Sequence, residues 1–233
     1  MPVFPIQFKN IFKIPNGLSP IFATLTDPLS DVIHGINILD IHLGDTVVVI
    51  GSGPIGTMLA ALASLRGASR VFLTDITENR LKMSKEILED FKRIDFLKVP
   101  REANKQKEFL KTKIGKDGAE KIIVASPSKT AQEYSLKLAK KRAKIVYFGG
   151  LPSVKNFIDF ESNILHYGEQ MVIGSYASSY NEQKLALKLI NLEIIPANRI
   201  INHIFPLESI NEGFILLDQG KVMKGVTLPN KSF

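Results

Sequence analysis

The feature that most constrains this chain is a run of β-branched apolar residues that passes directly into a glycine-rich turn. Residues 46–56 read T-V-V-V-I-G-S-G-P-I-G, and an Ala- and Leu-rich helix signal continues to residue 65. A second apolar run, residues 71–74, ends at Asp75, which lies 19 residues after Gly56. Strand, glycine turn, helix, strand and acid in this order predict a dinucleotide-binding unit.

Each residue of the motif has a physical role in that interpretation. Gly51 permits the tight turn, Gly53 lets the backbone approach a pyrophosphate, and Gly56 lets the helix pack closely on the sheet. The free N–H groups at the helix start are directed at the phosphate. Asp75 can accept hydrogen bonds from the adenosine ribose and repels a 2′-phosphate, so the sequence favours NAD over NADP. Arg80 tempers this preference, because it can reach a 2′-phosphate or lie over the adenine.

Composition excludes several kinds of site. The apolar fraction of 45% and the charged fraction of 23% are ordinary for a globular protein. The chain has no cysteine, which excludes a disulfide framework, thiolate zinc sites, iron–sulfur clusters and cysteine nucleophiles, and which suits a cytoplasmic protein. The four histidines are far apart and none has the spacing of helix metal ligands, so no metal site is predicted at His34, His42, His166 and His203.

The basic charge balance does not indicate a nucleic-acid partner. The net charge is +7 and the isoelectric point is near 9.4, but the lysines are scattered over helix surfaces without interleaved aromatic residues. The excess charge instead helps to attract an anionic dinucleotide. No apolar run reaches the ~18 residues of a membrane span, and the N-terminus shows no secretory signal, so we expect no membrane partner.

Strand signals recur along the chain and alternate with helix signals. They lie at residues 94–99, 121–125, 144–148 and 171–173. This alternation predicts an α/β fold with a doubly wound parallel sheet. Ligands of such sheets bind at the carboxyl ends of the strands, which here are residues 51–56, Asp75, 125–126, 148–151 and 174–176.

The helices are predicted from apolar periodicity and capping residues. Thr77 is expected to cap one helix, Ser128 a second that continues to Lys141, and Asn181 a third that carries Leu185, Leu189 and Leu192 on one face. Two further helices are expected at residues 28–39 and 105–113.

The last stretch, from Ile200 onward, has a different character. It is predicted to form a helix over residues 209–217 that ends at Gly220, and then a short strand at 226–228. The stretch is too small to bury its own core. It must therefore pack on the main unit, on residues 1–30, or on another chain.

Several segments together indicate a known family. They read F-K-I-P-N-G-L-S at 12–19, D-P-L-S-D-V-I-H-G at 27–35, T-D-I-T-E-N-R-L at 74–81, I-V-Y-F-G-G-L-P at 145–152 and F-P-L-E-S-I-N-E-G-F at 205–214, beside the glycine turn. With them the chain resembles the zinc-type medium-chain dehydrogenases, which include alcohol, sorbitol and threonine dehydrogenases. The resemblance is closest to the polyol and threonine branch.

The resemblance implies a Rossmann domain joined to a small remnant of a GroES-like catalytic domain. Residues 1–30 would be the remnant or linker, residues 31–195 the NAD(P)-binding domain, and residues 196–233 the segment that returns to the catalytic domain. Most of that domain would precede Met1, and the zinc ligands and proton relay with it. Asp27 stands where polyol dehydrogenases have a glutamate beside zinc, and Asp31 lies near a position where alcohol dehydrogenases may have a cysteine.

The resemblance also supplies the expected cofactor contacts, whereas it assigns no catalytic residue and no metal ligand to this chain. The contacts are Gly51, Ser52, Gly53, Pro54, Ile55, Gly56, Asp75, Ile76, Arg80, Ala125, Ser126, Phe148, Gly149, Gly150, Leu151, Ser175, Tyr176 and Lys224. Lys224 matches a basic residue near the pyrophosphate, and a solvated surface lysine is the alternative.

Three functions are compatible with the sequence. The first is the cofactor-binding portion of an NAD-dependent alcohol or polyol dehydrogenase, inactive alone, with zinc only if a partner chain supplies the ligands. The second is a non-enzymatic dinucleotide-binding subunit or sensor, and the third is a remnant that binds nothing. We expect a homo-oligomer or a separate catalytic polypeptide as partner, and exposed apolar surface around Phe4, Ile6, Phe205 and Phe214.

Overall fold

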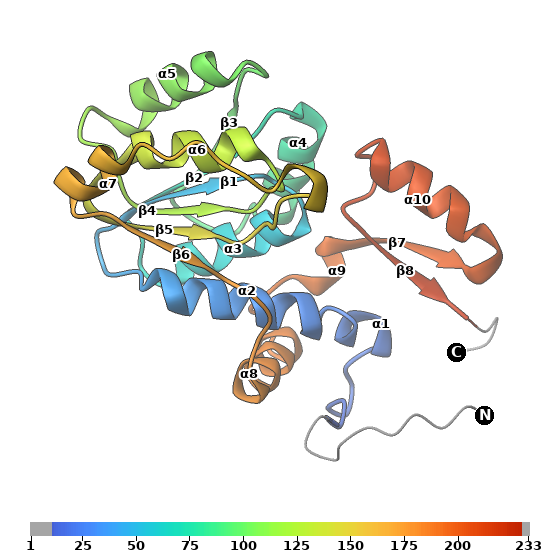
Figure 1. Ribbon diagram of the computed structural model, residues 1–233. Helices are drawn as coiled ribbons and strands as arrows, with labels where there is room; N and C mark the ends of the chain where they lie inside the picture. Colours follow the sequence, from blue (N-terminus) through green and yellow to red (C-terminus); the bar gives the residue numbers. More distant parts are fainter. Residues whose placement is uncertain (1–10, 230–233) are drawn as a thin grey trace.

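Six parallel strands form the central sheet of the computed structural model, which describes residues 11–229 apart from the side chains of Ala103, Asn104 and Lys155 (Figure 1). Their order, β3-β2-β1-β4-β5-β6, is that of the Rossmann fold, so the predicted fold class is confirmed. The strands are β1 (Thr46–Ile50), β2 (Arg70–Asp75), β3 (Ile94–Lys98), β4 (Ala119–Val124), β5 (Ala139–Tyr147) and β6 (Met171–Gly174).

Helices cover both faces of the sheet, and the strand residues alternate between the two resulting cores. Val47 and Val49 belong to one buried cluster, and Val48 and Ile50 belong to the other. Because both faces are covered, β1 is apolar and buried from Val47 to Ile50. The first cluster packs against α2 (Thr26–Leu39), α3 (Pro54–Leu65), α4 (Glu78–Ile87) and α8 (Tyr180–Asn191), and the second against α5 (Ala103–Ile114), α6 (Lys129–Leu138) and α7 (Ser162–Gly168).

Two helix ends differ from the sequence prediction. Helix α6 is capped by Ser128 as predicted, but it ends at Leu138 rather than Lys141 because β5 already begins at Ala139. Helix α8 is capped by Ser179 and not by Asn181. Ser179 and Glu182 form a capping box, in which each side chain bonds the backbone N–H of the other residue.

The buried face of α8 also differs from the prediction. Its buried residues are Ala186, Leu187 and Ile190, whereas Leu185 is 39% and Leu192 54% exposed. At the start of α4, Thr77 occupies the N-cap position as predicted, but its side chain makes no capping hydrogen bond.

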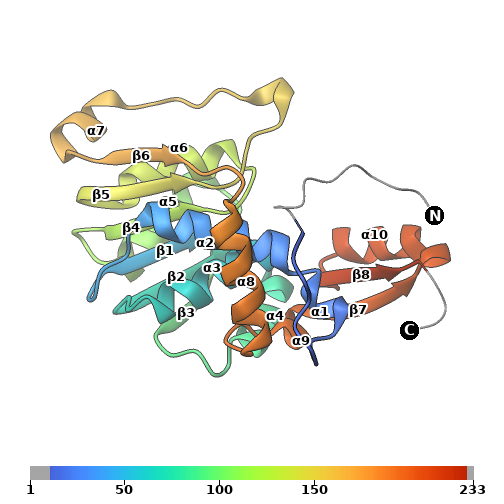
Figure 2. The ribbon, with the colours of Figure 1, turned by 90° about the horizontal axis from the view of Figure 1, so that it is seen from below.

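The first and the last elements of the described chain lie beside the carboxyl side of the sheet (Figure 1). The first elements are α1 (Pro20–Ala23) and α2, whose Leu29 is fully buried. The last elements are α9 (Ala197–Ile200), β7 (Ile201–Pro206), η3 (Leu207–Ser209), α10 (Ile210–Asp218) and β8 (Lys224–Leu228), and η2 (Ser153–Lys155) lies between β5 and α7. Strands β7 and β8 pair in parallel as a separate two-stranded sheet beside α1 and α9 (Figure 2). The sequence analysis did not predict β7.

This C-terminal segment packs on the main unit, which is the first of the three predicted alternatives. Ile201 and Met223 belong to the same buried cluster as α2 and α3. Asn79 of α4 donates to the carbonyl of Gly220 at 2.6 Å, and Arg199 is ion-paired with Asp90 at 2.8 Å.

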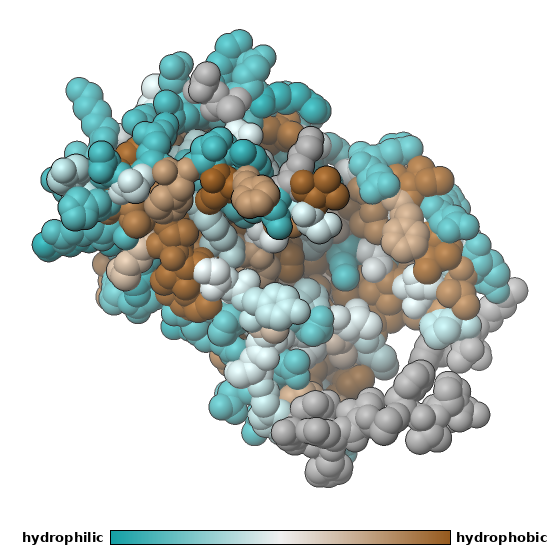
Figure 3. Space-filling view, in the orientation of Figure 1, coloured by the Kyte–Doolittle hydropathy of each residue, from teal (hydrophilic) through white to brown (hydrophobic). Residues whose placement is uncertain are grey.

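The prediction for Phe205 is wrong. It is only 5% exposed, because its ring lies over Gly213 and Gly225, where an added Cβ would come within 3.2 and 2.8 Å of the ring. Phe214 is 60% exposed as predicted, and Phe4 and Ile6 lie outside the described residues. Figure 3 shows apolar side chains gathered over α10 and the two-stranded sheet. Within residues 11–229, no helix is long and apolar enough to cross a membrane.

Candidate functional site

The glycine turn is fixed by close backbone contacts between β1, α3 and the neighbouring strands. Gly51 has a φ of +110°, a conformation that favours glycine, and its N–H donates to the carbonyl of Thr74 at 2.8 Å. A Cβ at Gly56 would lie 1.8 Å from the carbonyl oxygen of Gly51, so only glycine fits there. A Cβ at Gly53 would meet open space. Packing therefore does not require glycine at position 53, which faces the region where a ligand would approach.

The start of α3 offers unpaired backbone donors. Gly53 is the N-cap residue and Pro54 the first helical residue, a position that suits proline. The first intrahelical bond runs from Thr57 N–H to the carbonyl of Gly53 at 2.9 Å. The N–H groups of Ile55 and Gly56 precede it and are available to an anion, as at other helix N-termini.

Asp75 ends β2 with its carboxylate turned toward the glycine turn. Its Oδ2 accepts hydrogen bonds from the backbone N–H of Ser52 at 2.8 Å and from the Ser52 hydroxyl at 3.0 Å. Its Oδ1 accepts the backbone N–H of Thr77 at 2.8 Å. The carboxylate is buried, with the residue only 8% exposed. These bonds lock the acid and the turn into one rigid unit.

Two buried hydroxyls that the sequence analysis did not single out support this unit. Ser84 on α4 lies 2.9 Å from the hydroxyl of Thr57 on α3 and also donates to the carbonyl of Ser52 at 3.1 Å. Both residues are fully buried. The sequence offered one signal for this pair, namely a small polar residue on the apolar face of each helix. A hydroxyl buried on such a face is normally hydrogen-bonded.

A cleft of about 290 Å³ opens beside Asp75 at the carboxyl edge of the sheet. It brings together five of the predicted contact residues, Gly51, Asp75, Ile76, Arg80 and Ser126. The cleft is also lined by residues that the sequence analysis missed, namely Thr77, Val99, Arg101, Gln106, Ser128, Thr130 and Tyr134, together with strand residues Ile50 and Thr74. Thr77 follows β2, and most of the others follow β3 or lie at the start of α6 or on it. The sequence does not show that these separate segments meet at one cleft.

The ends of β4 and β5 lie against the turn. The N–H of Ala125 donates to the carbonyl of Ile50 at 2.8 Å, and that of Phe148 to the carbonyl of Val124 at 3.1 Å. A Cβ at Gly149 would lie 2.7 Å from the backbone of Ser126. The predicted residues Ala125, Ser126, Phe148 and Gly149 are therefore neighbours at one edge.

A second cleft, of about 300 Å³, lies at the ends of β5 and β6. It is lined by Phe148, Ser175 and Tyr176, which were predicted, and by Asp27 and Asp31 of α2. The remaining lining residues are Ala177, Ser178 and Gln183. The carboxylates of Asp27 and Asp31 thus lie with predicted contact residues at the carboxyl edge of the sheet.

The other predicted residues lie apart from these two clefts. Gly150 and Leu151 follow β5 in the segment that leads to η2, and neither lines the clefts described above. Lys224 begins β8 in the two-stranded sheet, where its backbone N–H donates to Asn202 Oδ1 at 3.4 Å.

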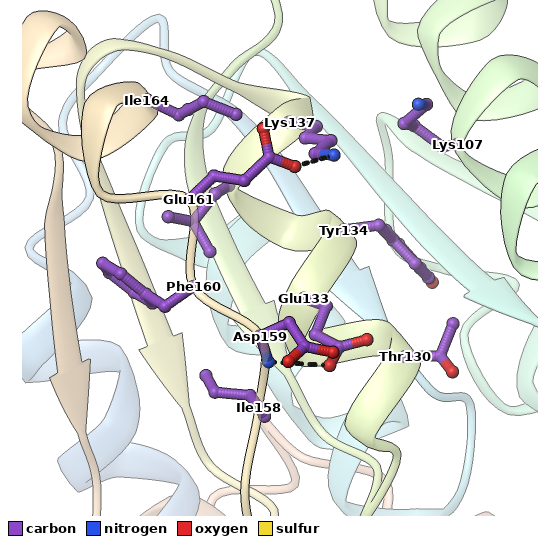
Figure 4. Close-up of a pocket in the computed structure, with 11 residues that line it drawn as sticks. Lys107, Thr130, Glu133, Tyr134, Lys137, Ile158, Asp159, Phe160, Glu161 and Ile164 are labelled. Carbon is purple, nitrogen blue, oxygen red and sulfur yellow. Dashed lines mark hydrogen bonds and ion pairs between the residues drawn. The ribbon is translucent and has the colours of Figure 1, made fainter.

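A third cavity, of about 500 Å³, lies between α6 and residues 158–164 (Figure 4). Ion pairs hold that segment to the helix: Lys129 is 3.4 Å from Asp159, and Lys137 pairs with Glu161. Tyr134 and Thr130 line both this cavity and the cleft beside Asp75, so the two spaces are neighbours. Burial raises the pKa of the Tyr134 hydroxyl, and the charge of Asp75 adds to the rise, so this phenol stays neutral.

The histidine nearest the second cleft has a structural role. His34 Nδ1 lies 3.0 Å from Glu182 Oε1, in the carboxylate that caps α8. Burial alone would raise the pKa of Glu182, but hydrogen bonds from Ser179, His34 and Asn37 outweigh it and leave the pKa below its ordinary value. Within the described residues, no three His, Asp or Glu side chains gather as a metal site would require.

The strand order, the glycine turn and the buried acid at the end of β2 together define a Rossmann-type domain. The family model described as zinc-binding dehydrogenase matches residues 54–191, which is more than half of the chain. The chain therefore belongs to the zinc-binding dehydrogenase family, a family of oxidoreductases.

Individual relatives agree with this assignment. A sorbitol dehydrogenase from Bombyx mori is 32% identical over 213 residues, which cover 91% of this chain and 59% of the relative. An L-threonine 3-dehydrogenase from Bacillus licheniformis is 28% identical, with 94% and 61% covered. The chain thus spans about three fifths of the length of these relatives.

Solved structures show the same fold. An alcohol dehydrogenase from Thermus sp. ATN1 has a TM-score of 0.81 at 21% identity, with 94% of this chain and 61% of that one covered. A dehydrogenase from Escherichia coli CFT073 in complex with NADH has a TM-score of 0.80 at 20% identity, with 96% and 64% covered. One from Sinorhizobium meliloti 1021 bound to NADP has a TM-score of 0.80 at 22% identity, with 94% and 62% covered.

The zinc that the family name implies does not fit the described residues. The chain has no cysteine, and residues 11–229 hold no cluster of three His, Asp or Glu. A dinucleotide does fit, because the helix start offers free N–H groups beside an open approach at Gly53, and Asp75 lines the adjoining cleft.

Proposed function

We propose that this chain is the dinucleotide-binding portion of a zinc-type dehydrogenase that transfers hydride between a secondary alcohol and NAD. One observation carries the proposal: the carboxylate of Asp75 is fixed against Ser52 in the glycine turn, beside a cleft lined by Gly51 and Arg80. A rigid acid beside free backbone amides suits a ribose next to a pyrophosphate.

The residues of the two clefts have distinct tasks in this proposal. The amides of Ile55 and Gly56 bind the pyrophosphate, Asp75 accepts a ribose hydroxyl, and Arg80 lies at the adenosine end. Phe148 and Tyr176, in the cleft at the ends of β5 and β6, orient the nicotinamide and exclude water from it. Bound NAD supplies the hydride chemistry, and the protein supplies orientation. The predicted contacts at Gly150, Leu151 and Lys224 belong to the same proposal.

The organisation and the cofactor preference are part of the proposal. We assign residues 1–30 to a remnant of the catalytic domain or a linker, 31–195 to the NAD(P)-binding Rossmann domain and 196–233 to the segment that returns to the catalytic domain. We place NAD ahead of NADP because the charge of Asp75 opposes a 2′-phosphate. The cytoplasm is the compartment we assign, since NAD-linked oxidation suits it and the chain has no cysteine.

The substrate class follows from the named relatives, which are sorbitol and threonine dehydrogenases. We infer a secondary alcohol, with a polyol as first choice. Because the described residues do not gather a zinc donor set, we assign the zinc ligands to a separate polypeptide or to a further part of the protein. The exposed residues Leu207, Phe214 and Ile215 form an apolar surface that the zinc-bearing part can contact. We also expect the chain to form homo-oligomers.

Fluorescence titration with NADH and an activity assay test the proposal together. We expect saturable NADH binding by the purified chain and no oxidation of sorbitol, threonine or simple alcohols with NAD and zinc. Turnover by the chain alone would contradict the proposal that the chain is inactive without the zinc-bearing part. Absence of NADH binding at millimolar concentration would overturn the whole proposal.

Asp75→Asn is the most direct variant. The amide retains the size of the side chain but loses its charge and replaces one acceptor oxygen by an NH₂ donor. We expect about tenfold weaker NADH binding, as for loss of a charge-assisted hydrogen bond of ~1.5 kcal/mol. The exposed Asp218→Asn removes an acid elsewhere and should leave binding unchanged. Equal NADH affinity in Asp75→Asn and the unaltered chain would remove Asp75 from the site.

A non-enzymatic dinucleotide-binding subunit is the second candidate. It is favoured by the lack of a metal donor set among residues 11–229. Co-purification distinguishes the two: a zinc-bearing polypeptide that restores alcohol oxidation supports the enzyme, whereas a stable oligomer that binds NADH and recruits no such polypeptide supports the subunit.

A further inference from the structure

Helix α8 carries two apolar faces, and the fold buries one of them. Ala186 and Ile190 belong to the buried cluster that contains α2. Leu185, Leu189 and Leu192 follow one another at intervals of four and three residues, so they share a second face of the helix. Leu185 is 39% and Leu192 54% exposed. Helix α8 lies farther from the sheet than α2 does (Figure 1), which leaves this second face, the leucine stripe, on the outside.

The leucine stripe borders an apolar cleft of about 350 Å³ between α2, α3 and α8. Ile33, Ile36 and Leu62 line this cleft and are buried, whereas Leu65 and Ile194 line it and are 53% and 39% exposed. An open cleft with apolar walls is the kind of surface into which a partner helix inserts its apolar side chains.

A wider cleft of about 670 Å³ adjoins the apolar one. Leu65 and Ile194 line both, so the two clefts meet, and together they form the α8 groove. The wider cleft adds Phe91 and Pro196 to the apolar lining. The α8 groove shares no lining residue with the two clefts at the carboxyl edge of the sheet. It is therefore separate from the proposed dinucleotide site.

The α8 groove has a basic border. Arg66 lines the apolar cleft, and Lys92 and Arg93 line the wider one. Lys184 and Lys188 each precede a leucine of the stripe and are exposed. None of the ion pairs in the described part of the chain involves these five side chains.

Acidic residues offset little of this charge. Asp90 and Glu193 also line the wider cleft, but Asp90 is already ion-paired with Arg199 at 2.8 Å. The border of the α8 groove is therefore positive overall. Opposite charges across an interface favour association and like charges oppose it, so the groove selects an acidic occupant.

The same charges disfavour other occupants. A second copy of this chain, placed stripe on stripe, would bring the basic borders of the two copies together. The chain's own residues 1–10 and 230–233 contain no acidic residue. A bilayer surface is flat on this scale and does not fill a cleft.

We propose that the α8 groove binds an amphipathic helix of another protein, which carries apolar side chains at i, i+3, i+4 and i+7 and acidic residues beside them. The apolar side chains enter between the leucine stripe and Leu65. The acidic side chains pair with Arg66, Lys184 and Lys188. The groove thus adds a protein partner to the proposed function and does not depend on the bound dinucleotide.

Fluorescence anisotropy of the full chain with a labelled synthetic peptide tests this docking surface. The peptide has about 16 residues, with leucine at i, i+3, i+4 and i+7 and glutamate or alanine elsewhere. We expect saturable binding at micromolar concentration, and none by a peptide of the same composition in scrambled order. Leu185→Gln should weaken binding about tenfold, because one apolar contact is lost. Leu43→Gln changes a leucine that is 87% exposed elsewhere and should leave binding unaltered.

Lys188→Glu tests the charge of the border. It should weaken binding of the glutamate peptide about tenfold and strengthen binding of a peptide with lysine in place of glutamate. The substituted side chains are exposed, so the melting temperature should stay within about 2 °C of that of the unaltered chain. NADH titration should give the same affinity for every variant.

Several outcomes would overturn the proposal. They are no binding of the glutamate peptide, equal binding of the scrambled peptide, tighter binding of the lysine peptide by the unaltered chain, and unimpaired binding by Leu185→Gln. Self-association in sedimentation that Leu185→Gln abolishes would assign the groove to a second copy instead. Binding to phosphatidylserine vesicles that Leu185→Gln abolishes would assign it to a membrane. Failure of NADH to bind overturns the proposed function and leaves the docking surface standing.

Discussion

At the scale of single residues, Gly53 and Gly56 of the glycine turn are glycines for different physical reasons. Gly56 is required by packing, since an added Cβ would collide with the backbone of Gly51 at 1.8 Å. Gly53 has open space where its Cβ would be and a φ of −69° that any residue adopts. The fold itself therefore tolerates a side chain at Gly53, and only an approaching ligand would forbid it.

This difference gives a paired prediction. Gly53→Ala should keep the melting temperature within about 2 °C, because a methyl group added in open space without strain changes stability by at most ~0.5 kcal/mol, yet it should weaken NADH binding about tenfold or more. Gly56→Ala should lower the melting temperature strongly or prevent folding. Circular dichroism melting and NADH titration check both variants. Gly53→Ala with unimpaired NADH binding would contradict the ligand approach over this residue.

At the scale of elements, the cap of α8 shows that a single capping residue is a weaker predictor of a helix start than a capping box of two residues. Asn181 is a good capping residue in isolation, but the capping box requires a Ser or Thr followed by Glu three residues later, which here are Ser179 and Glu182. The carboxylate of Glu182 also contacts His34 and Asn37 of α2. The cap therefore ties α8 to the helix beside it.

Ser179→Ala should destabilise the protein by about 1 kcal/mol, as for other lost N-caps. Asn181→Ala replaces the residue that the sequence suggested and should change stability by less than ~0.5 kcal/mol. Urea unfolding at pH 7 measures both. A larger loss in Asn181→Ala than in Ser179→Ala would contradict the cap assignment.

The same cap should make stability depend on pH. The pKa of Glu182 lies below its ordinary value of 4.5, so its contribution is present above that value and is lost as the pH falls through the lower pKa of the folded protein. Glu182→Gln should therefore lower the melting temperature at pH 7 and lower it much less at pH 3. Glu193→Gln, an exposed acid just beyond α8, is the control. A loss in Glu182→Gln that is equal at both pH values would show that its charge is unimportant.

At the scale of the whole molecule, the C-terminal segment is part of the main core. Met223 is 2% exposed and belongs to the cluster that contains α2 and α3. The small sheet β7–β8 cannot bury enough surface to be stable alone, and its attachment through Met223, Val226 and Ile201 supplies that burial.

Met223→Ala should therefore lower the free energy of unfolding of the whole protein by about 2–5 kcal/mol while unfolding stays one cooperative transition. The exposed Phe214→Ala should change it by less than ~0.5 kcal/mol. Urea titration followed by far-UV circular dichroism and by tyrosine fluorescence checks this. Two separate transitions in the unaltered chain would contradict a shared core.

The local patterns of the sequence determined the fold class. The apolar run of β1, the glycine turn, the helix after it and the acid at the end of β2 were each readable, because strand burial, turn geometry and helix packing restrict the residues that can stand there. The strand ends that should meet a ligand were located for the same reason. The exact cap of α8, the strand β7 and the burial of Phe205 were not, because each depends on a partner distant in sequence or in pattern.

Only the tertiary structure decided what stands opposite these residues. It turned Asp75 onto Ser52, so that the protein itself uses most of the acceptor positions of this carboxylate. It also brought Arg101, from the segment after β3, and Tyr134, from α6, to the same cleft. Hydrophobic pattern and chain stiffness act between near neighbours and are written in the sequence. The charge and hydrogen bonding of a cleft are sums over side chains from distant segments, and they exist only once the sheet has brought those segments together.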